Sequence, residues 1–302
     1  MGAVWVLNLD AEAELERPRG YRPSAATLER IARYEAVAAR ALLGPADEVF
    51  REGDVPALAW RGRPGRAFCP TPRALARLNV AGCVLPRAPK LEALRAANDR
   101  ALSFRLARGL PGSFWIAPGR EPVAVARDLE RLAGSVIDRA GGGRWLLKRS
   151  FSSAGRGRRR VRPADLREDD RSWIAASLER GGLVVEPWVE RIEVEFVLHA
   201  ILSPSGDLDA VGQILVQVAD AHGAWLRCER TTSSNAPSPS ECRELHAALR
   251  HAAAELAALG YFGPFGIDAY RGELADGTRV FVALGELNAR YTMCWNLGVP
   301  RV

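Results

Sequence analysis

Lys148 is the first residue of this 302-residue chain whose type and position could do chemistry, because only it and Lys90 are lysines among 42 Lys and Arg residues. It ends a predicted strand, residues 144–148, and a loop rich in Gly and Ser follows. A lysine is a compact point charge on a thin side chain, so it suits a buried strand end facing a phosphate better than the broad guanidinium group does. The pattern predicts a cation placed against a phosphate.

The loop after Lys148 is suited to bind an anion. Backbone N–H groups of small residues can approach a polyphosphate closely, and serine hydroxyls add further donors. The loop lacks the G-x-x-x-x-G-K-[ST] sequence of a P-loop and the third glycine of a dinucleotide-binding loop. We therefore predict an anion-binding loop of another kind, with a solvated basic loop as the alternative. Its candidate residues are Ser150, Ser152, Ser153, Ala154, Gly155 and Gly157.

Three oxygen donors near the C-terminal end predict a magnesium site. Glu286 and Asn288 lie two residues apart on a predicted strand and so point to one face, while Asp268 lies on the preceding strand. Carboxylate and amide oxygens on one sheet face suit Mg²⁺ that bridges the phosphates of a nucleotide. The alternative is a strand face that meets solvent.

The loop between these two strands decides whether the three donors share a face. A two-residue turn at residues 276–277 would point Asp268 away from Glu286. A three-residue loop over 275–277, with its glycine in the left-handed conformation, pairs Asp268 with Leu284 instead. Asp268 then lies on the same face as Glu286. The magnesium hypothesis therefore requires the three-residue loop.

A further stretch, VVEPWVERIEVEF, offers groups for a base and a ribose. Its strand ends at Glu186 and continues into a Pro-Trp-Val segment whose backbone groups can face a base edge. Either of the two acids that follow, Glu193 or Glu195, can accept hydrogen bonds from ribose hydroxyls. The residues of the segment are Pro187, Trp188 and Val189.

Strands and helices mix along the whole chain, so the predicted fold class is α+β. Hydrophobic periodicity predicts helices over residues 24–43, 73–80, 90–109, 122–139 and 164–179. A last helix begins at the capping box of Ser238 and Glu241 and ends at Gly260. Predicted strands cover residues 3–9, 144–148, 182–189, 194–202, 210–218, 224–230, 265–271 and 278–288.

The composition is that of a globular protein, with 48% hydrophobic and 26% charged residues. The net charge of +6 admits nucleic acid as a partner, but only Arg156 to Arg162 forms a dense basic run, and no aromatic residues are interleaved with it. Nucleic-acid binding is therefore disfavoured. The N-terminus lacks the pattern of a signal peptide, and no apolar stretch is long enough to span a membrane, so we expect no membrane association.

The five cysteines form no CxxC pair, which predicts reduced thiols and a cytoplasmic protein. Cys294 is expected to be a buried, inert thiol, the alternative being a residue that lines a substrate pocket. The four histidines fit no zinc-binding spacing and are expected to be structural or exposed. Arg230, in the polar stretch 228–239, is a candidate for substrate contact, the alternative being a plain connection between elements.

Four motifs in order make residues 95–295 resemble the ATP-grasp superfamily. NDRALSFRLARGLPGSF is similar to the helix where the family usually has a phosphate-binding lysine, and here Arg100 stands at that place. LLKRSFSSAGRGRRRV is similar to the second lysine strand and the phosphate-covering loop, with Lys148 as the lysine. VVEPWV resembles the adenine hinge, and FGIDAY with GELNARYT resembles the metal-binding strands.

The resemblance implies a role for each motif. Glu186 would lie near the exocyclic amine of adenine, with backbone groups of Pro187 and Val189 at the base edge. Arg290 would contact the transferred phosphate and the substrate, and would act in catalysis with Lys148. The implied magnesium ligands are Asp268, Glu286 and Asn288. Two candidates for the ribose acid stay open, Glu193 by its spacing from Val189 and Glu195 by its local Glu-Phe sequence.

The resemblance also implies an architecture and a reaction. Residues 1–95 would form a small α/β domain, 96–190 the first ATP-grasp lobe with the phosphate loop and hinge, and 191–302 the second lobe with the metal-binding strands. Two lobes would clasp ATP and one or two Mg²⁺ ions, with Mn²⁺ as a substitute. The implied enzyme activates a small-molecule carboxylate as an acyl phosphate and joins it to an amine or another nucleophile.

Two further expectations complete the sequence analysis. A homodimer is the default oligomeric state. A non-catalytic scaffold that binds ATP is the alternative to a ligase, because Arg100 replaces the family's usual lysine.

Overall fold

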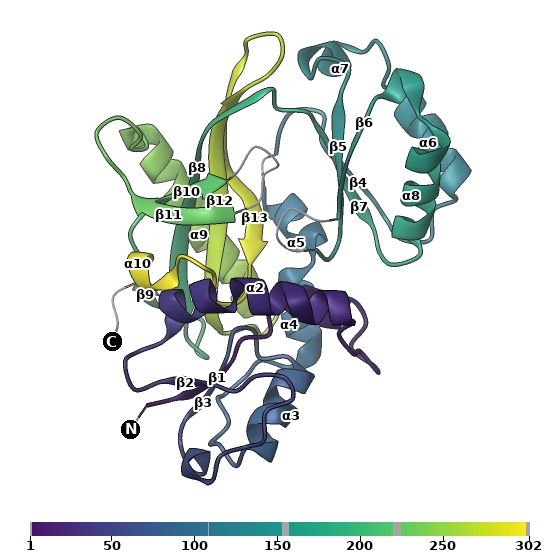
Figure 1. Cartoon of the computed structure of the whole chain (residues 1–302). Coiled ribbons are helices and arrows are strands. Elements are labelled where there is room, and N and C mark those ends of the chain that lie inside the picture. Colours follow the sequence, from purple (N-terminus) through teal and green to yellow (C-terminus); the bar gives the residue numbers. More distant parts are fainter. Residues whose placement is uncertain (1, 108, 153–156, 220–224, 300–302) are drawn as a thin grey trace.

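Three β-sheets carry the fold in the computed structural model, which describes residues 2–107, 109–152, 157–219 and 225–299 (Figure 1). One sheet lies in the N-terminal third, one in the middle and one in the C-terminal half of the chain. Helices and strands mix throughout, which confirms the predicted α+β class. Among the residues so described, no helix is long and apolar enough to cross a membrane.

The N-terminal sheet is parallel, with the strand order β2-β1-β3. Its strands are β1 (Val4–Val6), β2 (Glu48–Val49) and β3 (Gly65–Ala67). Only β1 is predicted from the sequence, because strands as short as β2 and β3 leave no periodic pattern. The helices around this sheet are α1 (Ala11–Glu16), α2 (Ala25–Leu42), the 3₁₀ helix η1 (Leu58–Trp60) and α3 (Pro72–Val80).

Two helices connect the N-terminal sheet to the rest of the chain where one helix, residues 90–109, is predicted. They are α4 (Leu91–Asn98) and α5 (Arg100–Leu106). The helix is interrupted because Asp99 adopts an extended conformation and its carboxylate accepts a hydrogen bond from the N–H of Ala101 at 2.8 Å. This break makes Arg100 the first residue of α5.

The middle sheet is antiparallel, with the strand order β4-β7-β5-β6. Its strands are β4 (Phe114–Ile116), β5 (Trp145–Arg149), β6 (Arg158–Val161) and β7 (Leu183–Pro187). The strand β6 is not predicted, because its sequence RRRV lacks apolar alternation. The helices beside this sheet are α6 (Pro122–Glu130), α7 (Val136–Ala140), the 3₁₀ helix η2 (Pro163–Asp165) and α8 (Glu168–Leu178). The predicted helix 122–139 is thus two helices, separated by a turn in which Gly134 has a φ of 75°.

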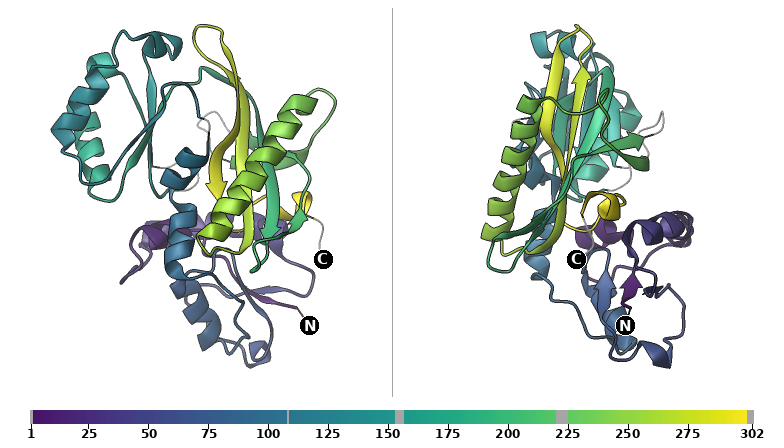
Figure 2. Two further views of the ribbon diagram at one scale, coloured as in Figure 1. Left: turned by 180° about the vertical axis from the view of Figure 1, so that it is seen from behind. Right: turned by 90° about the vertical axis from the view of Figure 1, so that its left-hand side faces the viewer.

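The C-terminal sheet has six strands, in the order β11-β10-β8-β12-β13, with β9 paired to β8. They are β8 (Arg191–Leu202), β9 (Leu208–Val211), β10 (Leu215–Ala219), β11 (Trp225–Arg230), β12 (Gly263–Glu273) and β13 (Arg279–Asn288). The long helix α9 (Pro239–Ala258) lies across one face of this sheet (Figure 2). Its predicted capping box of Ser238 and Glu241 is confirmed.

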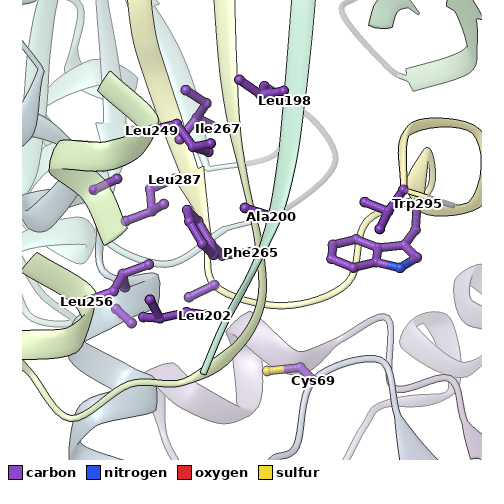
Figure 3. Packing of buried hydrophobic residues seen from close by; sticks show 14 of the residues in the cluster. Cys69, Leu198, Ala200, Leu202, Leu249, Leu256, Phe265, Ile267, Leu287 and Trp295 are labelled. Atoms are coloured by element: carbon purple, nitrogen blue, oxygen red, sulfur yellow. The ribbon is translucent and has the colours of Figure 1, made fainter. Parts of the chain in front are cut away.

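The face of the C-terminal sheet toward α9 is the main hydrophobic core. Phe265 and Ile267 of β12 pack with Leu287 of β13 against Leu249 and Leu256 of α9 (Figure 3). Burying one such side chain contributes roughly 1.5–3 kcal/mol, which fixes the sheet on this helix. Because side chains alternate along a strand, the polar residues between them face the other side of the sheet.

The predicted division into three domains stays a prediction. The boundary after residue 95 falls inside α4, and the boundary after residue 190 falls between β7 and β8. The last short helix, α10 (Trp295–Gly298), packs near β8 and β11.

Candidate active site

A cleft of about 1200 Å³ opens between the middle sheet and the C-terminal sheet, and the N-terminal third contributes part of its wall. Pockets for drug-sized ligands span roughly 300–1000 Å³, so this cleft can hold a nucleotide together with a second small molecule. The lining residues that matter below are Glu12, Lys148, Arg158, Arg160, Glu186, Pro187, Trp188, Val189, Glu193, Glu195, Asp268, Glu286, Asn288 and Arg290. Most of the predicted site residues therefore face one space.

The hairpin of β12 and β13 has the three-residue loop that the magnesium hypothesis requires. The N–H of Leu274 donates to the carbonyl of Thr278 at 2.9 Å, which leaves residues 275–277 as the loop. Gly277 has a φ of 84°, the left-handed conformation expected of it.

The predicted partner of Asp268 in this hairpin is wrong. Asp268 lies opposite Glu286 and not opposite Leu284, because the register shifts by two residues between Asp268 and Tyr270. A shift of two residues keeps every side chain on its face of the sheet, whereas a shift of one would reverse it. The two carboxylates therefore become direct cross-strand neighbours on the cleft side.

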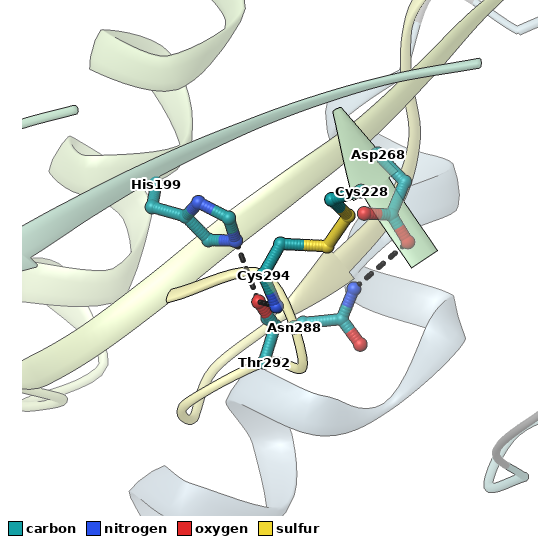
Figure 4. The surroundings of a disulfide bond; sticks show 6 residues. All are labelled: His199, Cys228, Asp268, Asn288, Thr292 and Cys294. Atoms are coloured by element: carbon teal, nitrogen blue, oxygen red, sulfur yellow. Dashed lines mark hydrogen bonds between the residues drawn. A yellow bond between two sulfur atoms is a disulfide. The ribbon is translucent and has the colours of Figure 1, made fainter. Parts of the chain in front are cut away.

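Asp268 is a half-buried carboxylate that forms no ion pair with any residue the structure describes, although the positive charge of Arg290 acts on it. The amide nitrogen of Asn288 donates to its Oδ2 at 3.0 Å (Figure 4). Burial raises the pKa of Asp268 to about 7, and the negative charges of Glu286 and Glu195 add to this rise. Arg290 opposes this rise in the pKa of Asp268, and a metal cation beside Asp268 would lower the pKa further and stabilise the ionised form.

The donor set around Asp268 fits Mg²⁺. Two carboxylates and an amide are hard oxygen ligands, and the negative charges of Glu286 and Glu195 beside Asp268 favour a cation at Asp268. In the part of the chain that the structure describes, no group of three or more His, Cys, Asp or Glu side chains could hold a metal ion. The remaining ligands would therefore be phosphate oxygens or water, which Mg²⁺ commonly retains.

Glu286, by contrast, is surrounded by cations. Its Oε1 lies 2.7 Å from Arg100, and its Oε2 lies 3.2 Å from Arg158. Burial alone would raise the pKa of Glu286, but nearby positive charges outweigh it and hold this pKa at about 2. These charges are those of Arg100, Arg158 and Lys148. Through its ion pair with Arg158 of β6, Glu286 of β13 connects the C-terminal sheet to the middle sheet.

Arg100 fixes the start of the predicted phosphate loop. Its buried guanidinium group donates to the carbonyls of Arg149 at 2.9 Å and Ser152 at 3.0 Å, and it contacts the Ser152 hydroxyl. Gly157 lies at the other end of the loop with a φ of 63°. Three predicted loop residues lie outside the described residues: Ser153, Ala154 and Gly155.

Lys148 is buried near the end of β5, as expected, with 8% of its surface exposed. Its Nζ lies 2.6 Å from Oε2 of Glu186 on the neighbouring strand β7. On the other side β5 pairs with β6, where Arg158 lies opposite Lys148. The lysine side chain reaches the cleft from a strand that has a neighbour on each side. An arginine there would place a broader, planar group in the same space.

The predicted hinge offers one free backbone donor. The N–H of Trp188 donates to the carbonyl of Arg144 at 2.9 Å and is therefore occupied. The N–H of Val189 has no hydrogen-bond partner within the described ranges, and Val189 lines the cleft. Of the two, Val189 is the residue whose N–H can meet a base edge.

The two candidate ribose acids have different surroundings. Glu193 lies 3.1 Å from Arg191, at the end of β8 that follows the hinge. Glu195 lies opposite Gln217 and Tyr270, and its pKa is raised by burial, while Arg158 lowers it and Glu286 adds a smaller rise. Glu195 is thus in the electrostatic neighbourhood of Asp268 and Glu286, whereas Glu193 lies nearer the hinge in the chain.

Comparison with solved structures gives matches over nearly the whole chain. A D-cycloserine synthetase, DcsG, has a TM-score of 0.55 at 16% sequence identity, with 99% of this chain and 95% of that chain covered. A carboxyaminoimidazole ribonucleotide synthase from Aspergillus clavatus, complexed with ATP, has a TM-score of 0.51 at 16% identity, with 97% and 71% covered. A D-alanyl-alanine synthetase A from Vibrio cholerae has a TM-score of 0.51 at 13% identity, with 98% and 90% covered.

The chain has the ATP-grasp fold. At these identities the likeness establishes the fold and leaves the substrates open. No protein-family profile matches the sequence, and no curated protein is a significant sequence match.

Arg290, which follows the hairpin of β12 and β13, connects it to the N-terminal third. It forms an ion pair with Glu12 of α1 and lies over the ring of Phe68, 5.1 Å from its centroid. The Oε2 atom of Glu12 is buried without a hydrogen-bond partner in the described structure. Sequence reasoning misses Glu12, because 278 residues separate it from Arg290 and no local motif marks it.

Arg230, predicted to contact substrate, does not line the ATP-grasp cleft. Its side chain is exposed and lies 3.4 Å from the amide oxygen of Gln213. The preceding residue, Glu229, lines the cleft instead. Across the sheet, Arg230 lies opposite Leu215, Leu215 opposite Val197, and Val197 opposite Asp268. Arg230 is therefore on the same face of the sheet as Asp268, and its contact with substrate stays a prediction.

The cysteine prediction is wrong for one pair. Cys294 is buried, as expected, but it forms a disulfide with Cys228 of β11 at a Cα separation of 5.7 Å (Figure 4). This bond ties the segment after β13 to the edge of the C-terminal sheet. The two cysteines are 66 residues apart, so their spacing carries no signal of the pairing.

Proposed function

We propose that the chain is an ATP-dependent ligase that activates a carboxylate as an acyl phosphate and joins it to an amine or another nucleophile. The observation that carries this proposal is the shared cleft, in which Lys148 of the middle sheet faces Asp268 and Glu286 of the C-terminal sheet. A nucleoside triphosphate with its metal requires cations and oxygen donors around one polyphosphate. The ATP-grasp fold supports the same assignment.

We assign the parts of ATP along the cleft from the hinge to the hairpin. The base would lie at the hinge, with the N–H of Val189 at its edge and Glu186 near its exocyclic amine. The ribose would lie at Glu193, since Glu195 belongs to the acidic group around Asp268. The triphosphate would lie between Lys148 and the loop of residues 150–157.

In the proposed reaction, an oxygen of the substrate carboxylate attacks the γ-phosphorus, ADP leaves, and an acyl phosphate forms. The amine then attacks the carbonyl carbon, loses a proton, and displaces inorganic phosphate. Lys148 would hold the transferred phosphate and Arg290 would orient it beside the carboxylate, so both act on charge that grows in the transition state. Asp268, Glu286 and Asn288 would hold one or two Mg²⁺ ions, or Mn²⁺, which neutralise the phosphate oxygens when bound.

The binding site for the carboxylate and the amine would lie beyond the metal strands, where Arg290 meets Glu12. Both residues line the cleft there. The three-domain division, a cytoplasmic location and a homodimer stay predictions.

The alternative of a nucleic-acid-binding surface is less well supported. In β6, Arg158 faces Glu286, Arg159 pairs with Asp170, and Arg160 lies over the ring of Trp188 at 4.4 Å. These arginines have partners within the protein and do not form a free basic surface. The alternative of a scaffold that binds ATP without turnover predicts binding with no ADP release.

Two measurements test the proposal. Thermal unfolding with ATP and Mg²⁺ should show stabilisation, roughly 2.7 kcal/mol at a hundred times Kd. Incubation with ATP, Mg²⁺, hydroxylamine and pooled carboxylic acids should release ADP and form a hydroxamate, because hydroxylamine traps an acyl phosphate. Stabilisation without ADP release from any pool would support the scaffold. Absence of ATP binding would contradict the proposal.

A further inference from the structure

We propose that Arg158 is a further phosphate-binding residue, which releases Glu286 and binds the triphosphate when a metal–nucleotide complex enters the cleft. This inference rests on the proposed function, because it requires a nucleotide in this cleft. Arg158 is the first residue of β6 and lies directly opposite Lys148 of β5.

Arg158 is placed to reach two partners. Its side chain lines the cleft and is 35% exposed, and its Nη2 donates to Oε2 of Glu286 at 3.2 Å. Across the described ranges, Glu286 is the only group that its side chain pairs with. The long contact and the exposure mean that the guanidinium group can turn toward a new acceptor at little cost.

Arg100, the other arginine on Glu286, is held differently. It is buried, and besides Glu286 it donates to the backbone carbonyls of Arg149 and Ser152. Moving Arg100 would break both of these hydrogen bonds to partly buried carbonyl groups and leave its own buried guanidinium group without acceptors, which is costly. Of the two arginines, only Arg158 is therefore free to exchange partners.

The charges around Glu286 favour such an exchange. Each of its two carboxylate oxygens faces one arginine, so a divalent cation binding there competes directly with Arg158. The metal ion and the arginines on this carboxylate repel each other. Arg158 is the one displaced, because its contact with Glu286 is longer than that of Arg100. The phosphate oxygens that arrive with the metal supply a new charge-assisted partner for the guanidinium group. Glu286 and Arg158 each keep a partner of opposite charge before and after the exchange.

The exchange predicts effects of opposite sign for one substitution. Arg158→Gln removes the cation that competes at Glu286, so Mn²⁺ alone should bind the nucleotide-free protein severalfold more tightly. The same substitution removes a phosphate partner, so the ATP analogue AMPPNP with Mg²⁺ should bind on the order of tenfold more weakly. A purely structural role for Arg158 would weaken both.

The experiment measures free Mn²⁺ by electron paramagnetic resonance and AMPPNP binding by titration calorimetry. Arg160→Gln is the matched control for Mn²⁺, because it removes the same charge from the same strand face but contacts Trp188 and not Glu286. It should leave the Mn²⁺ affinity unchanged. Arg158→Lys keeps the charge and should fall between wild type and Arg158→Gln, and it serves if the glutamine variant does not fold.

The outcomes separate this inference from the proposed function. Tighter Mn²⁺ binding together with weaker AMPPNP binding supports the exchange. Wild-type affinity for both ligands, or loss of both, overturns the exchange and leaves the ligase proposal standing. If the wild-type protein binds no nucleotide, the proposed function fails and this inference fails with it.

Discussion

At the scale of residues, the identity of position 148 can be tested directly. Lys148 is buried, and its Nζ contacts Glu186 on the cleft wall. We predict that Lys148→Ala lowers ADP release on the order of a hundredfold or more, because a preorganised charge at the transferred phosphate is lost. Lys148→Arg should also be impaired, since the guanidinium fork does not fit a site shaped for an ammonium group. Lys90→Ala, the exposed second lysine, should match wild type.

The placement of single residues in the cleft is predicted from the sequence more reliably than their contacts. Lys148 and Glu286 are found by type and spacing, because a strand end and a two-residue period fix where a side chain points. Arg158 and Glu12 are not found, because their partners lie 128 and 278 residues away. Arg230 stays a candidate for substrate contact, because it shares the sheet face of Asp268 although it does not line the cleft.

At the scale of elements, the ends of the phosphate loop make a second prediction. Gly157 and Gly143 have similar φ values, 63° and 69°. A Cβ atom at Gly157 would lie 2.5 Å from Cβ of Ser152, whereas at Gly143 it would meet nothing within 4 Å. The alanine side chain would force the loop to shift away from Ser152. If this shift costs the bound state about 1.4 kcal/mol or more, Gly157→Ala weakens ATP binding about tenfold or more, which is the result we expect. Gly143→Ala should show only the common strain cost of about 1–2 kcal/mol in the free energy of unfolding.

Calorimetric titration with ATP and thermal unfolding of both alanine variants check this prediction. Equal ATP affinity in the two variants would show that the contact between Gly157 and Ser152 does not shape the loop.

Helices and strands are predicted well where a local sequence signal marks them, and poorly where they depend on pairing with another strand. The sequence predicts the hairpin after β12 but leaves a two-residue and a three-residue loop open. The register shift beside Tyr270 has no local signal, because it depends on how two strands pack. The break at Asp99 has a local cause, an aspartate cap, yet the helical pattern continues across it. The strand β6 forms because β5 offers it an edge, although its own sequence is basic.

At the scale of the whole molecule, the disulfide constrains the route of the chain. Cys228 and Cys294 close a loop of 66 residues, and the chain-entropy relation gives about 4 kcal/mol of stabilisation for such a loop. We predict that a reductant lowers the unfolding midpoint of the wild-type protein but not that of Cys228→Ser. Cys242→Ser, which alters a cysteine outside the disulfide, should retain the response to reductant. A wild-type midpoint that reductant leaves unchanged would contradict the predicted stabilisation.

The buried histidine of β8 makes the stability of the whole molecule depend on pH. His199 is fully buried and lies 2.6 Å from the hydroxyl of Thr292. Burial lowers the pKa of His199 from its ordinary 6.5 to about 4, because the charged ring is poorly solvated. Between these two values the unfolded chain binds a proton that the folded chain does not, so stability falls as the pH falls from 6.5 to 4.

Denaturant unfolding of wild type and His199→Gln at several pH values isolates this contribution. A glutamine can still donate to Thr292 but does not titrate, and every other group titrates in both proteins alike. The wild type should lose up to about 3 kcal/mol more than the variant between pH 6.5 and 4, the equivalent of the pKa difference. Below pH 4 the two curves should run parallel again, because the histidine is then protonated in both states. If the stability curves of wild type and variant stay parallel over the whole pH range, the pKa of His199 is not lowered in the folded protein, and the prediction is wrong.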